Sequence, residues 1–463
     1  MRDARIALLA WTAPAFALFL SSVALANGRF PASNQIVFSP ADPRLVVVRT
    51  TFGILLSHDG GATWAWLCEE ALGISPSSPS DPVLAVTSGG ASGGSSGGIL
   101  FATRGLDNGV VVSTDMGCGW EQSPEPLASQ IVKDLAVRPD APDRVLAVTS
   151  TYGAHAGAEG GPGYAQQVYE MADAGWSPVG QPIDSGMLVT SFEVAAADPR
   201  RIYVSALRFG SPVPTASLFV TTDDGAHWVE RAVPLDARNE AAAYIAAVDS
   251  TDANRVYLRT SGSPSRLLVT VDAGQTFAAA LSLNGQMRGF ALSADGSKVY
   301  AGSVEDGLFV AARADLAFKN VSSIHVQCLA THGADLWACA DEPSGFIAGV
   351  SADDGATFAA KLRLAPQPPL ACGADAAATQ CLGVPLQQLC ALLSGCDSAL
   401  GAASPDAGAP GAAAPPDAGV ERGPSRSACG CSTVGASGGW PGQWMAAGLA
   451  AAGSMRRRRR RLL

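Results

Sequence analysis

A short motif, [ST]-x-D-x-G-x-x-[WF], recurs along the chain, and its spacing restricts the fold more than any other feature of the sequence. The Asp, Gly and aromatic residues of its five intact copies are Asp59, Gly61 and Trp64; Asp115, Gly117 and Trp120; Asp223, Gly225 and Trp228; Asp272, Gly274 and Phe277; and Asp353, Gly355 and Phe358. One degenerate copy keeps Asp173, Gly175 and Trp176, and another, Ala311–Phe318, keeps the spacing and the aromatic residue. We call this segment the Asp-turn motif. Seven copies at intervals of about 47 residues predict seven similar structural units.

Each unit contains the pattern of four short strands. An apolar strand is followed by a turn rich in Asp and Pro, such as Asp42-Pro43, Asp81-Pro82 or Asp198-Pro199, and then by a β-branched run such as Leu45–Val48. One strand enters the Asp-turn motif and another leaves it. Four strands per unit are typical of a propeller blade. The sequence therefore predicts an all-β fold, a seven-bladed β-propeller, although six or eight blades would also fit the chain length.

The chemistry of the Asp-turn motif predicts a structural role. The Asp carboxylate can accept hydrogen bonds from N–H groups two residues on, Gly supplies a positive φ, the hydroxyl ties the entering strand, and the aromatic ring packs on the blade. The pairs Asp223-Asp224 and Asp353-Asp354 leave calcium binding as an alternative, but the turn already gives these carboxylates a sufficient role. We therefore expect no metal and no cofactor.

The motif resembles the Asp-box, or BNR repeat, of sialidases, sortilin-type receptors, xyloglucanases and photosystem assembly factors. This resemblance implies a propeller whose motifs lie at the periphery, away from the ligand-binding face. A sialidase would need three arginines around a carboxylate, an acid/base Asp and a Tyr–Glu nucleophile pair. Arg29, in Arg29-Phe30-Pro31, stands roughly where that family has its first arginine. The residues that could supply the others are Arg104, Arg208, Arg259, Arg266 and Arg288, and their spacing singles out none of them.

Two Gly-rich insertions suggest a binding surface. Gly89–Gly98 and Tyr152–Gly163 are expected at equivalent places in the second and third blades, where loops line one face of a propeller. The candidate binding residues near them are Arg104, Asp107, Tyr152 and His155. The alternative is that both insertions are solvated, variable loops.

The ten cysteines indicate an oxidising compartment. Cys328 and Cys339 flank an expected hairpin and could bridge it, and Cys68 could pair with Cys118. A cluster that follows the propeller, Cys372, Cys381, Cys390 and Cys396, predicts a small disulfide-stapled cap, for which three pairings are open. A zinc site is the alternative, but the cluster contains no CxxC pair.

The two ends of the chain have the composition of targeting signals. Arg2 and Arg5, an apolar run and the small-x-small site ending at Ala26 predict a secretory signal peptide. At the other end, a Pro/Ala/Gly linker precedes Cys429-Gly430-Cys431, a weakly apolar segment and six consecutive arginines. This end resembles the MYXO-CTERM sorting tail of myxobacterial surface proteins. The resemblance implies export, processing at Cys429 or Cys431 by a membrane protease, and retention at the cell surface; a C-terminal membrane anchor is the alternative.

These signals divide the chain into a signal peptide (1–26), a propeller (27–368), a Cys-rich cap (369–400), a linker (401–427) and a sorting tail (428–463). The whole chain has a net charge of −10. Removal of Arg2, Arg5, Asp3 and the six C-terminal arginines leaves 23 basic and 40 acidic residues, a net charge of −17. This charge argues against nucleic acid and anionic lipid as partners, so membrane contact is expected only through the tail.

The sequence thus favours an exported, non-catalytic propeller that binds a protein or glycan partner at the cell surface. Signal peptidase and a tail-processing protease would be its other partners. An exported glycosidase of sialidase type is the main alternative, and an envelope assembly or scaffold factor is a third reading.

Overall fold

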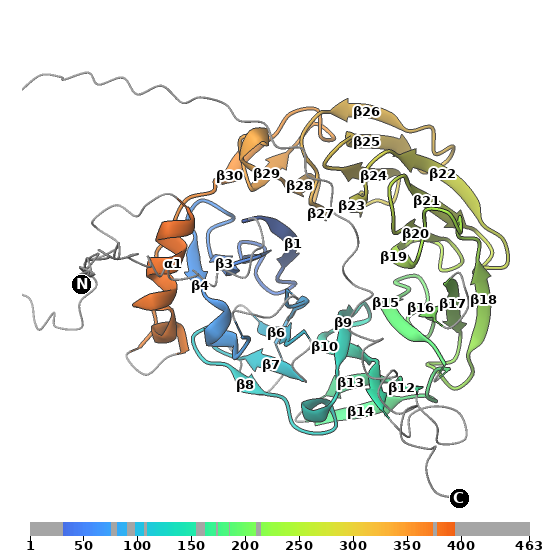
Figure 1. Ribbon diagram of the computed structural model, residues 1–463, viewed down its shortest axis with the longest axis horizontal. Coiled ribbons are helices and arrows are strands. Elements are labelled where there is room, and N and C mark those ends of the chain that lie inside the picture. Colours follow the sequence, from blue (N-terminus) through green and yellow to red (C-terminus); the bar gives the residue numbers. More distant parts are fainter. Residues whose placement is uncertain are drawn as a thin grey trace, which may run out of the picture. The chain divides into compact units, whose positions relative to one another are not determined.

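The computed structural model describes residues 31–75, 81–89, 98–105, 109–153, 163–172, 175–184, 186–209, 214–373 and 377–393. Seven four-stranded antiparallel sheets surround a central channel, which confirms the predicted seven-bladed β-propeller (Figure 1). From axis to rim, blades 1 to 3 consist of β1 (Ser33–Phe38), β2 (Val46–Thr50), β3 (Gly53–Ser57) and β4 (Ala65–Leu67); β5 (Leu84–Thr87), β6 (Ile99–Thr103), β7 (Val110–Ser113) and β8 (Glu121–Gln122); and β9 (Val132–Arg138), β10 (Ala141–Thr149), β13 (Val168–Ala172) and β14 (Gly175–Val179).

Blades 4 to 7 follow the same order without interruption. Their strands are β15 (Leu188–Val194), β16 (Ile202–Arg208), β17 (Thr215–Thr221) and β18 (Val229–Val233); β19 (Ala243–Val248), β20 (Val256–Thr260), β21 (Ser265–Thr270) and β22 (Ala278–Leu283); β23 (Met287–Leu292), β24 (Lys298–Ser303), β25 (Gly307–Ala312) and β26 (Lys319–Ser322); and β27 (Cys328–His332), β28 (Asp335–Cys339), β29 (Ala348–Ser351) and β30 (Ala359–Leu362). Blade 3 carries an extra two-stranded hairpin, β11 (Thr151–Gly153) and β12 (Gly163–Ala165).

The hydrophobic core is divided among the interfaces between blades. The middle strands are apolar on both faces, as in Val46-Val47-Val48, because each blade is covered on both sides by its neighbours. One cluster, for example, joins Leu146 and Val148 of blade 3 to Phe192 and Val204 of blade 4. Burial of these faces therefore stabilises the ring as a whole rather than single blades.

The intact Asp-turn motifs connect the third and fourth strands of blades 1, 2, 4, 5 and 7. In blade 1, Ser57 Oγ donates to Asp59 Oδ1 at 2.8 Å and accepts from Gly61 N–H at 2.8 Å. Asp59 Oδ1 also accepts from the N–H groups of Ala62 and Thr63 at 2.9 and 2.8 Å. The expected acceptor role is confirmed, but the donors lie three and four residues after the Asp rather than two. The loop is wider because two successive residues, Gly60 and Gly61, have positive φ.

The glycine and the ring of each motif contact the preceding blade. A Cβ added to Gly225, whose φ is 77°, would lie 3.0 Å from the carbonyl oxygen of Val179 in blade 3. Trp228 packs in the same interface, and its Nε1–H donates to Gln181 O at 3.0 Å. The motif is therefore a spacer between blades as well as a turn.

The described residues that flank the two Gly-rich insertions lie at opposite ends of the propeller, which corrects the expectation that the insertions are at equivalent places. Residues 88–98 connect β5 to β6, the first and second strands of blade 2, at the end that carries the Asp-turns. Residues 150–167 connect the second and third strands of blade 3 at the other end. The error arises because Asp81-Pro82 precedes the innermost strand of blade 2, whereas Asp42-Pro43 follows that of blade 1.

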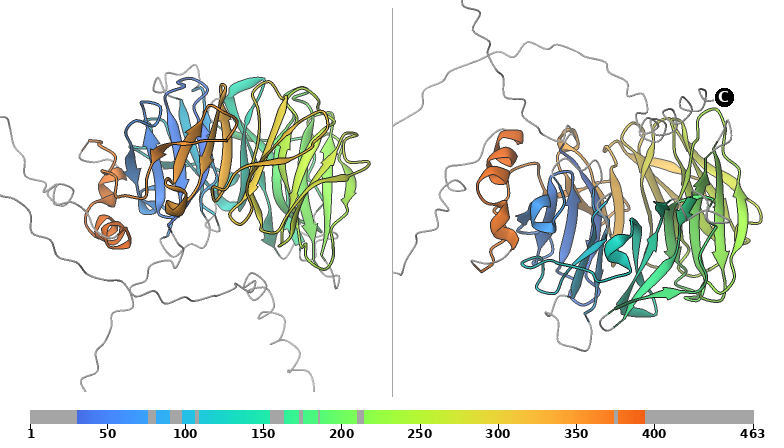
Figure 2. Two further views of the ribbon diagram at one scale, coloured as in Figure 1. Left: turned by 90° about the horizontal axis from the view of Figure 1, so that it is seen from above. Right: turned by 60° about the horizontal axis from the view of Figure 1, so that its bottom comes forward.

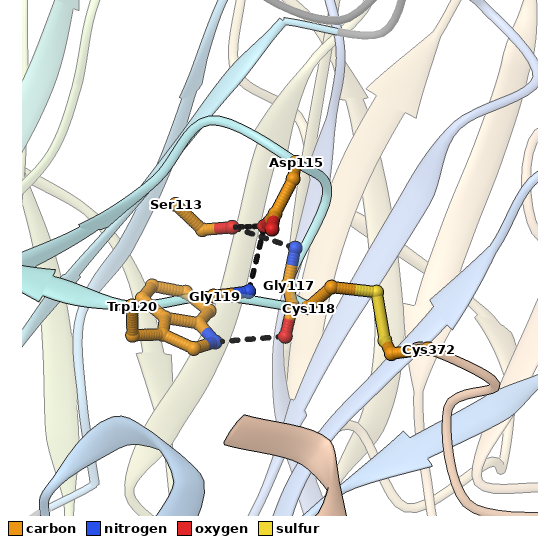
Figure 3. The surroundings of a disulfide bond; sticks show 7 residues. All are labelled: Ser113, Asp115, Gly117, Cys118, Gly119, Trp120 and Cys372. Atoms are coloured by element: carbon orange, nitrogen blue, oxygen red, sulfur yellow. Dashed lines mark hydrogen bonds between the residues drawn. A yellow bond between two sulfur atoms is a disulfide. The ribbon is translucent and has the colours of Figure 1, made fainter. Parts of the chain in front are cut away.

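The segment after blade 7 returns to the rim of blades 1 and 2. Trp66 on β4 forms a parallel bridge with Pro369, and the helical turn η5 (Ala377–Cys381) and helix α1 (Val384–Leu392) follow beside the rim (Figure 2). Two disulfides attach this segment to the propeller: Cys68–Cys381, and Cys118–Cys372, which Figure 3 shows. We call residues 368–393 the clasp.

These disulfides overturn part of the cysteine prediction. Cys68 does not pair with Cys118, and Cys372 and Cys381 bridge to the propeller instead of to other cysteines of the expected cap. Sequence spacing could not reveal pairs separated by 313 and 254 residues. The predicted bridge between Cys328 and Cys339 is confirmed, because those residues lie opposite each other on β27 and β28.

Candidate functional site

The innermost strands of five blades carry an extra residue near the same end of the channel. On β15, for example, Val189 pairs with Ala206 and Ser191 with Ser205, so Thr190 has no partner in the register. The five residues inserted in this way are Asn34, Lys133, Thr190, Ala246 and Arg288. A bulge bends the strand and redirects a side chain, and bulges are frequent beside functional sites.

All five bulged residues line one cavity of about 420 Å³. Residues of all seven blades contribute to it, including Val83 from blade 2 and Cys328 from blade 7. The bulges lie near the starts of the innermost strands, and the Asp-turns follow the ends of the third strands, so the cavity and the Asp-turns occupy opposite ends of the propeller. We call this cavity the channel mouth; its strands surround the centre of Figure 1.

Four cationic side chains line the channel mouth: Lys133, Arg49, Arg259 and Arg288. Arg49 is held structurally, since its Nε donates to Asn34 Oδ1 at 2.6 Å and its Nη1 to Pro82 O at 2.9 Å. Arg259 Nη1 donates to Met287 O at 3.1 Å. Arg288 is exposed and donates through Nη1 to Gln327 Oε1 at 2.7 Å. Arg259 and Arg288 therefore keep N–H groups that can donate to a ligand.

The ring of Tyr244 orients one of these cations. The guanidinium carbon of Arg259 lies 5.1 Å from the centre of that ring, within the range of a cation–π contact. Tyr244 itself lines the channel mouth. The contact limits the motion of a guanidinium that would otherwise have to be ordered when a ligand binds.

One carboxylate, Asp134, lies close to these cations, and a second, Glu193, interacts with Asp134. Asp134 lines the cavity, and burial raises its pKa to about 6, against the opposing effect of hydrogen bonds from Phe192 N–H at 3.2 Å and Leu135 N–H at 3.0 Å. Burial and the charge of Asp134 raise the pKa of Glu193 to about 8. Burial also lowers the pKa of Lys133. The balance of charge in this region therefore changes with pH across the neutral range.

The candidate binding residues taken from the sequence do not form one site. Arg104 lies at the rim, where its Nη2 donates to Gly73 O at 2.7 Å and its Nη1 to Gln122 Oε1 at 3.3 Å. Tyr152 is on β11 and is 63% exposed. The other singled-out positions lie outside the described residues: Asp107, His155, Arg29, Asp173, Ala26, Cys429 and Cys431.

Of the five further arginines considered for a carboxylate site, two meet at the channel mouth. Arg259 and Arg288 line it, whereas Arg208 pairs with Asp184 at 2.6 Å and Arg266 with Glu240 at 2.6 Å, away from the cavity. Sequence reasoning missed Arg49, Lys133, Asp134 and Glu193. The only local signal was the polar pair Lys133-Asp134 near the start of a strand that is otherwise apolar up to Arg138.

The paired carboxylates considered for calcium have other partners. Asp353 is used within its turn, and Asp354 accepts hydrogen bonds from Tyr300 OH at 2.7 Å and Lys298 Nζ at 2.5 Å. Asp224 pairs with Arg138 at 3.2 Å across the blade interface. Within the described part of the chain, no group of three or more His, Cys, Asp or Glu side chains is arranged to hold a metal ion. Nor does any described helix have the length and apolar character needed to cross a bilayer.

Comparison with known proteins finds similarity only among solved structures. No protein-family model matches the chain, and no curated protein matches it. The GH74 enzyme of Niastella koreensis is 15% identical over 70% of this chain, with a TM-score of 0.35, and the GH74 xyloglucanase of Xanthomonas campestris is 13% identical over 73%, with a TM-score of 0.36. The chain spans 62% and 65% of the length of these two proteins. YCF48 from Cyanidioschyzon merolae is 14% identical over 66% of this chain and 92% of its own, with a TM-score of 0.45.

Proposed function

We propose that this protein is an exported, non-catalytic β-propeller that binds an anionic group of a glycan or protein partner at the channel mouth. One observation carries the proposal: separate bulges place Lys133 and Arg288 in a cavity to which all seven blades contribute. The two residues come from blades 3 and 6, so they approach the cavity from well-separated parts of the ring. Their convergence is notable in a molecule whose exported part has an expected net charge of −17.

The donor set suits a carboxylate, sulfate or phosphate group. The guanidinium N–H groups of Arg288 and Arg259 can bind two oxygens of such a group, and the Lys133 ammonium supplies a third cation. The cavity volume of about 420 Å³ lies within the range of small-molecule sites, about 300–1,000 Å³.

The residues that bind the anion differ from the set that a sialidase needs. Three arginines line the cavity, but Arg49 already donates to Asn34 and Pro82 through Nε and Nη1. This engagement favours binding over hydrolysis.

Export and surface retention belong to the same proposal. They rest on the signal-like N-terminus, the CGC and poly-Arg tail, and the resemblance of the repeat to the Asp-box. The disulfides Cys68–Cys381, Cys118–Cys372 and Cys328–Cys339 support an oxidising location, since cytosolic thiols are kept reduced.

The binding proposal is tested by calorimetric titration of the purified protein with sodium D-galacturonate and sodium N-acetylneuraminate, with D-galactose as the neutral control. We expect at least one acid to bind, galactose not to bind, and affinity to fall as salt is raised. Arg288→Ala and Lys133→Ala should each weaken binding about tenfold, while Arg104→Ala at the rim should not. Equal binding of acid and neutral sugar, or no effect of either channel substitution, would overturn the proposal.

A glycoside hydrolase of sialidase type is the second candidate, because Asp134 and Tyr244 share the cavity with the arginines and the pKa of Asp134 is raised to about 6. A carboxyl group with such a pKa could act as an acid or base near neutral pH. Turnover of a fluorogenic sialoside that Asp134→Asn abolishes would favour this function. Absence of turnover under conditions where galacturonate or neuraminate binds would favour the non-catalytic one.

A further inference from the structure

A pair of tyrosines stands on an inserted hairpin at the channel-mouth end of blade 3. Tyr152 on β11 lies directly opposite Tyr164 on β12, and their ring centres are 5.4 Å apart with an interplanar angle of 65°. Tyr164 is partly buried and supports Tyr152, which is 63% exposed. We call this pair the tyrosine ledge.

The hairpin is tied to the strands that line the channel mouth. Ile131 N–H, just before β9, donates to Thr151 Oγ1 at 2.7 Å. Ser150 Oγ accepts from Val189 N–H, at the start of β15, at 3.2 Å. Tyr152 follows Thr151, and Lys133 is two residues after Ile131, so these links limit the Cα separation of Tyr152 and Lys133 to roughly 18 Å.

A second exposed aromatic residue lies at the same end of the propeller. Phe209, directly after β16 in blade 4, is 53% exposed. Among the described residues, the large apolar side chains that are exposed include two aromatic ones, Tyr152 and Phe209. Both are on the blades that contribute Lys133 and Thr190 to the cavity.

We propose that the ligand is an acidic oligosaccharide, with one charged sugar in the channel mouth and a following sugar stacked on Tyr152. The inference rests on the proposed anion-binding function and names the class of ligand. The C–H groups on one face of a pyranose pack against an aromatic ring, and a ring held by a neighbouring tyrosine loses little freedom on binding. A charged site beside an aromatic ledge therefore fits a short chain of sugars better than a single anion.

The cavity favours a glycan over an acidic peptide. Besides the cations, it is lined by Thr190, Ser191 and Asn34, whose side chains already hydrogen-bond to Ala243 O, Ser205 Oγ and Asp81 Oδ2. Their hydroxyl and amide oxygens can accept hydrogen bonds from the hydroxyls that a sugar acid presents around its single carboxylate. An acidic peptide would instead need a row of cations along an extended groove, whereas the cations here converge on one cavity.

The test compares D-galacturonate with tetragalacturonate by calorimetry of the purified protein. We expect the tetramer to bind at least ten times more tightly than the monomer. Tyr152→Ala should weaken tetramer binding about three- to tenfold and leave monomer binding unchanged, while Tyr152→Phe should retain tetramer binding. Val271→Ala, at an exposed apolar position in the Asp-turn of blade 5 at the opposite end, is the matched control and should have no effect.

The other possible results of this test would each overturn a different part of the proposal. Equal affinity for monomer and tetramer, or no effect of Tyr152→Ala, would overturn the ledge and leave the anion site standing. Binding of hexaglutamate in place of tetragalacturonate, weakened by Tyr152→Ala, would reject a glycan in favour of a peptide. Failure of galacturonate, N-acetylneuraminate, tetragalacturonate and hexaglutamate to bind would overturn the proposed function itself.

Discussion

The indole Nε1–H of Trp64 donates a hydrogen bond of 2.9 Å to the main-chain carbonyl of Lys361, which follows it by 297 residues. Trp64 belongs to the Asp-turn of blade 1, and Lys361 lies on β30, the outermost strand of blade 7. The first and last blades are therefore joined by the same contact that Trp228 makes from blade 4 to blade 3. The motif that repeats along the chain also closes the ring.

Replacement of Trp64 should open this junction. Trp64→Ala removes a buried ring and is expected to lower the free energy of unfolding by about 3–5 kcal/mol. Trp64→Phe keeps much of the packing, loses the hydrogen bond and should cost about 1 kcal/mol. Urea denaturation monitored by circular dichroism measures both, and a loss below 1 kcal/mol for Trp64→Ala would contradict a closing role.

The clasp disulfides should stabilise the ring more than the hairpin disulfide does. Cys118–Cys372 closes a loop of 254 residues and Cys328–Cys339 one of 11, and the entropy removed from the unfolded chain grows with loop length. We expect Cys118→Ser with Cys372→Ser to cost about 2–5 kcal/mol, and the matched Cys328→Ser with Cys339→Ser less. Thermal unfolding of the two double variants shows which disulfide contributes more to stability. Peptide mapping without reduction should find the pair Cys118–Cys372 and not Cys68–Cys118.

Glu193 should make the protein less stable in alkaline solution. Because its pKa is raised from the ordinary value of 4.5 to about 8, the folded state binds a proton that the unfolded state releases between those values. The contribution of Glu193 to the free energy of unfolding is therefore full below about pH 4.5 and is lost as the pH rises toward 8.

Glu193→Gln removes this titration. The free energy of unfolding of the variant should therefore equal that of the wild type at pH 5 and exceed it by about 2–4 kcal/mol at pH 9. Chemical denaturation across this pH range provides the measurement. Glu121→Gln, on the exposed strand β8, is the control, and a constant difference between Glu193→Gln and wild type would contradict the prediction.

Anion binding at the channel mouth should tighten as the pH falls. Protonation of Glu193 and Asp134 removes negative charge, while Lys133, whose pKa is lowered by burial, becomes more fully charged. Arg49, Arg259 and Arg288 also line this region, and Tyr244 packs on Arg259. We expect galacturonate affinity to rise about tenfold from pH 8.5 to pH 5.5. Calorimetry at fixed ionic strength tests this, and unchanged affinity would contradict it.

The Asp-turn carboxylates should control acid unfolding. Hydrogen bonds from the hydroxyl of Thr276, followed by other donors of the turn, lower the pKa of Asp272 to about 2, and the equivalent bonds from Thr357 lower that of Asp353 to about 2. Their stabilisation is present above about pH 4 and is lost as the pH falls toward 2. Asp353→Asn should therefore destabilise the protein at pH 7 and change it little at pH 2. Thermal unfolding at both values measures this, with Asp143→Asn outside the turns as control.

The sequence by itself determined the repeat and therefore the fold. Each Asp-turn is enforced within eight residues, because a hydroxyl, a carboxylate and a glycine satisfy their own backbone, as they do around Asp59 and Gly61. Because these contacts form within one short segment, the spacing of the residues in the sequence is enough to predict the turn. The hairpin disulfide Cys328–Cys339 was predictable for the same reason.

Only the tertiary structure decided the clasp and the channel mouth. The partner of Cys118 lies 254 residues away, and it comes within reach only after seven blades close the ring. Lys133, Arg259 and Arg288 share no motif or spacing, because the blades contribute to the cavity from different positions on or beside their two innermost strands. The bulges that turn Lys133 and Arg288 inward depend on pairing with the next strand, so no pattern in the sequence predicts them.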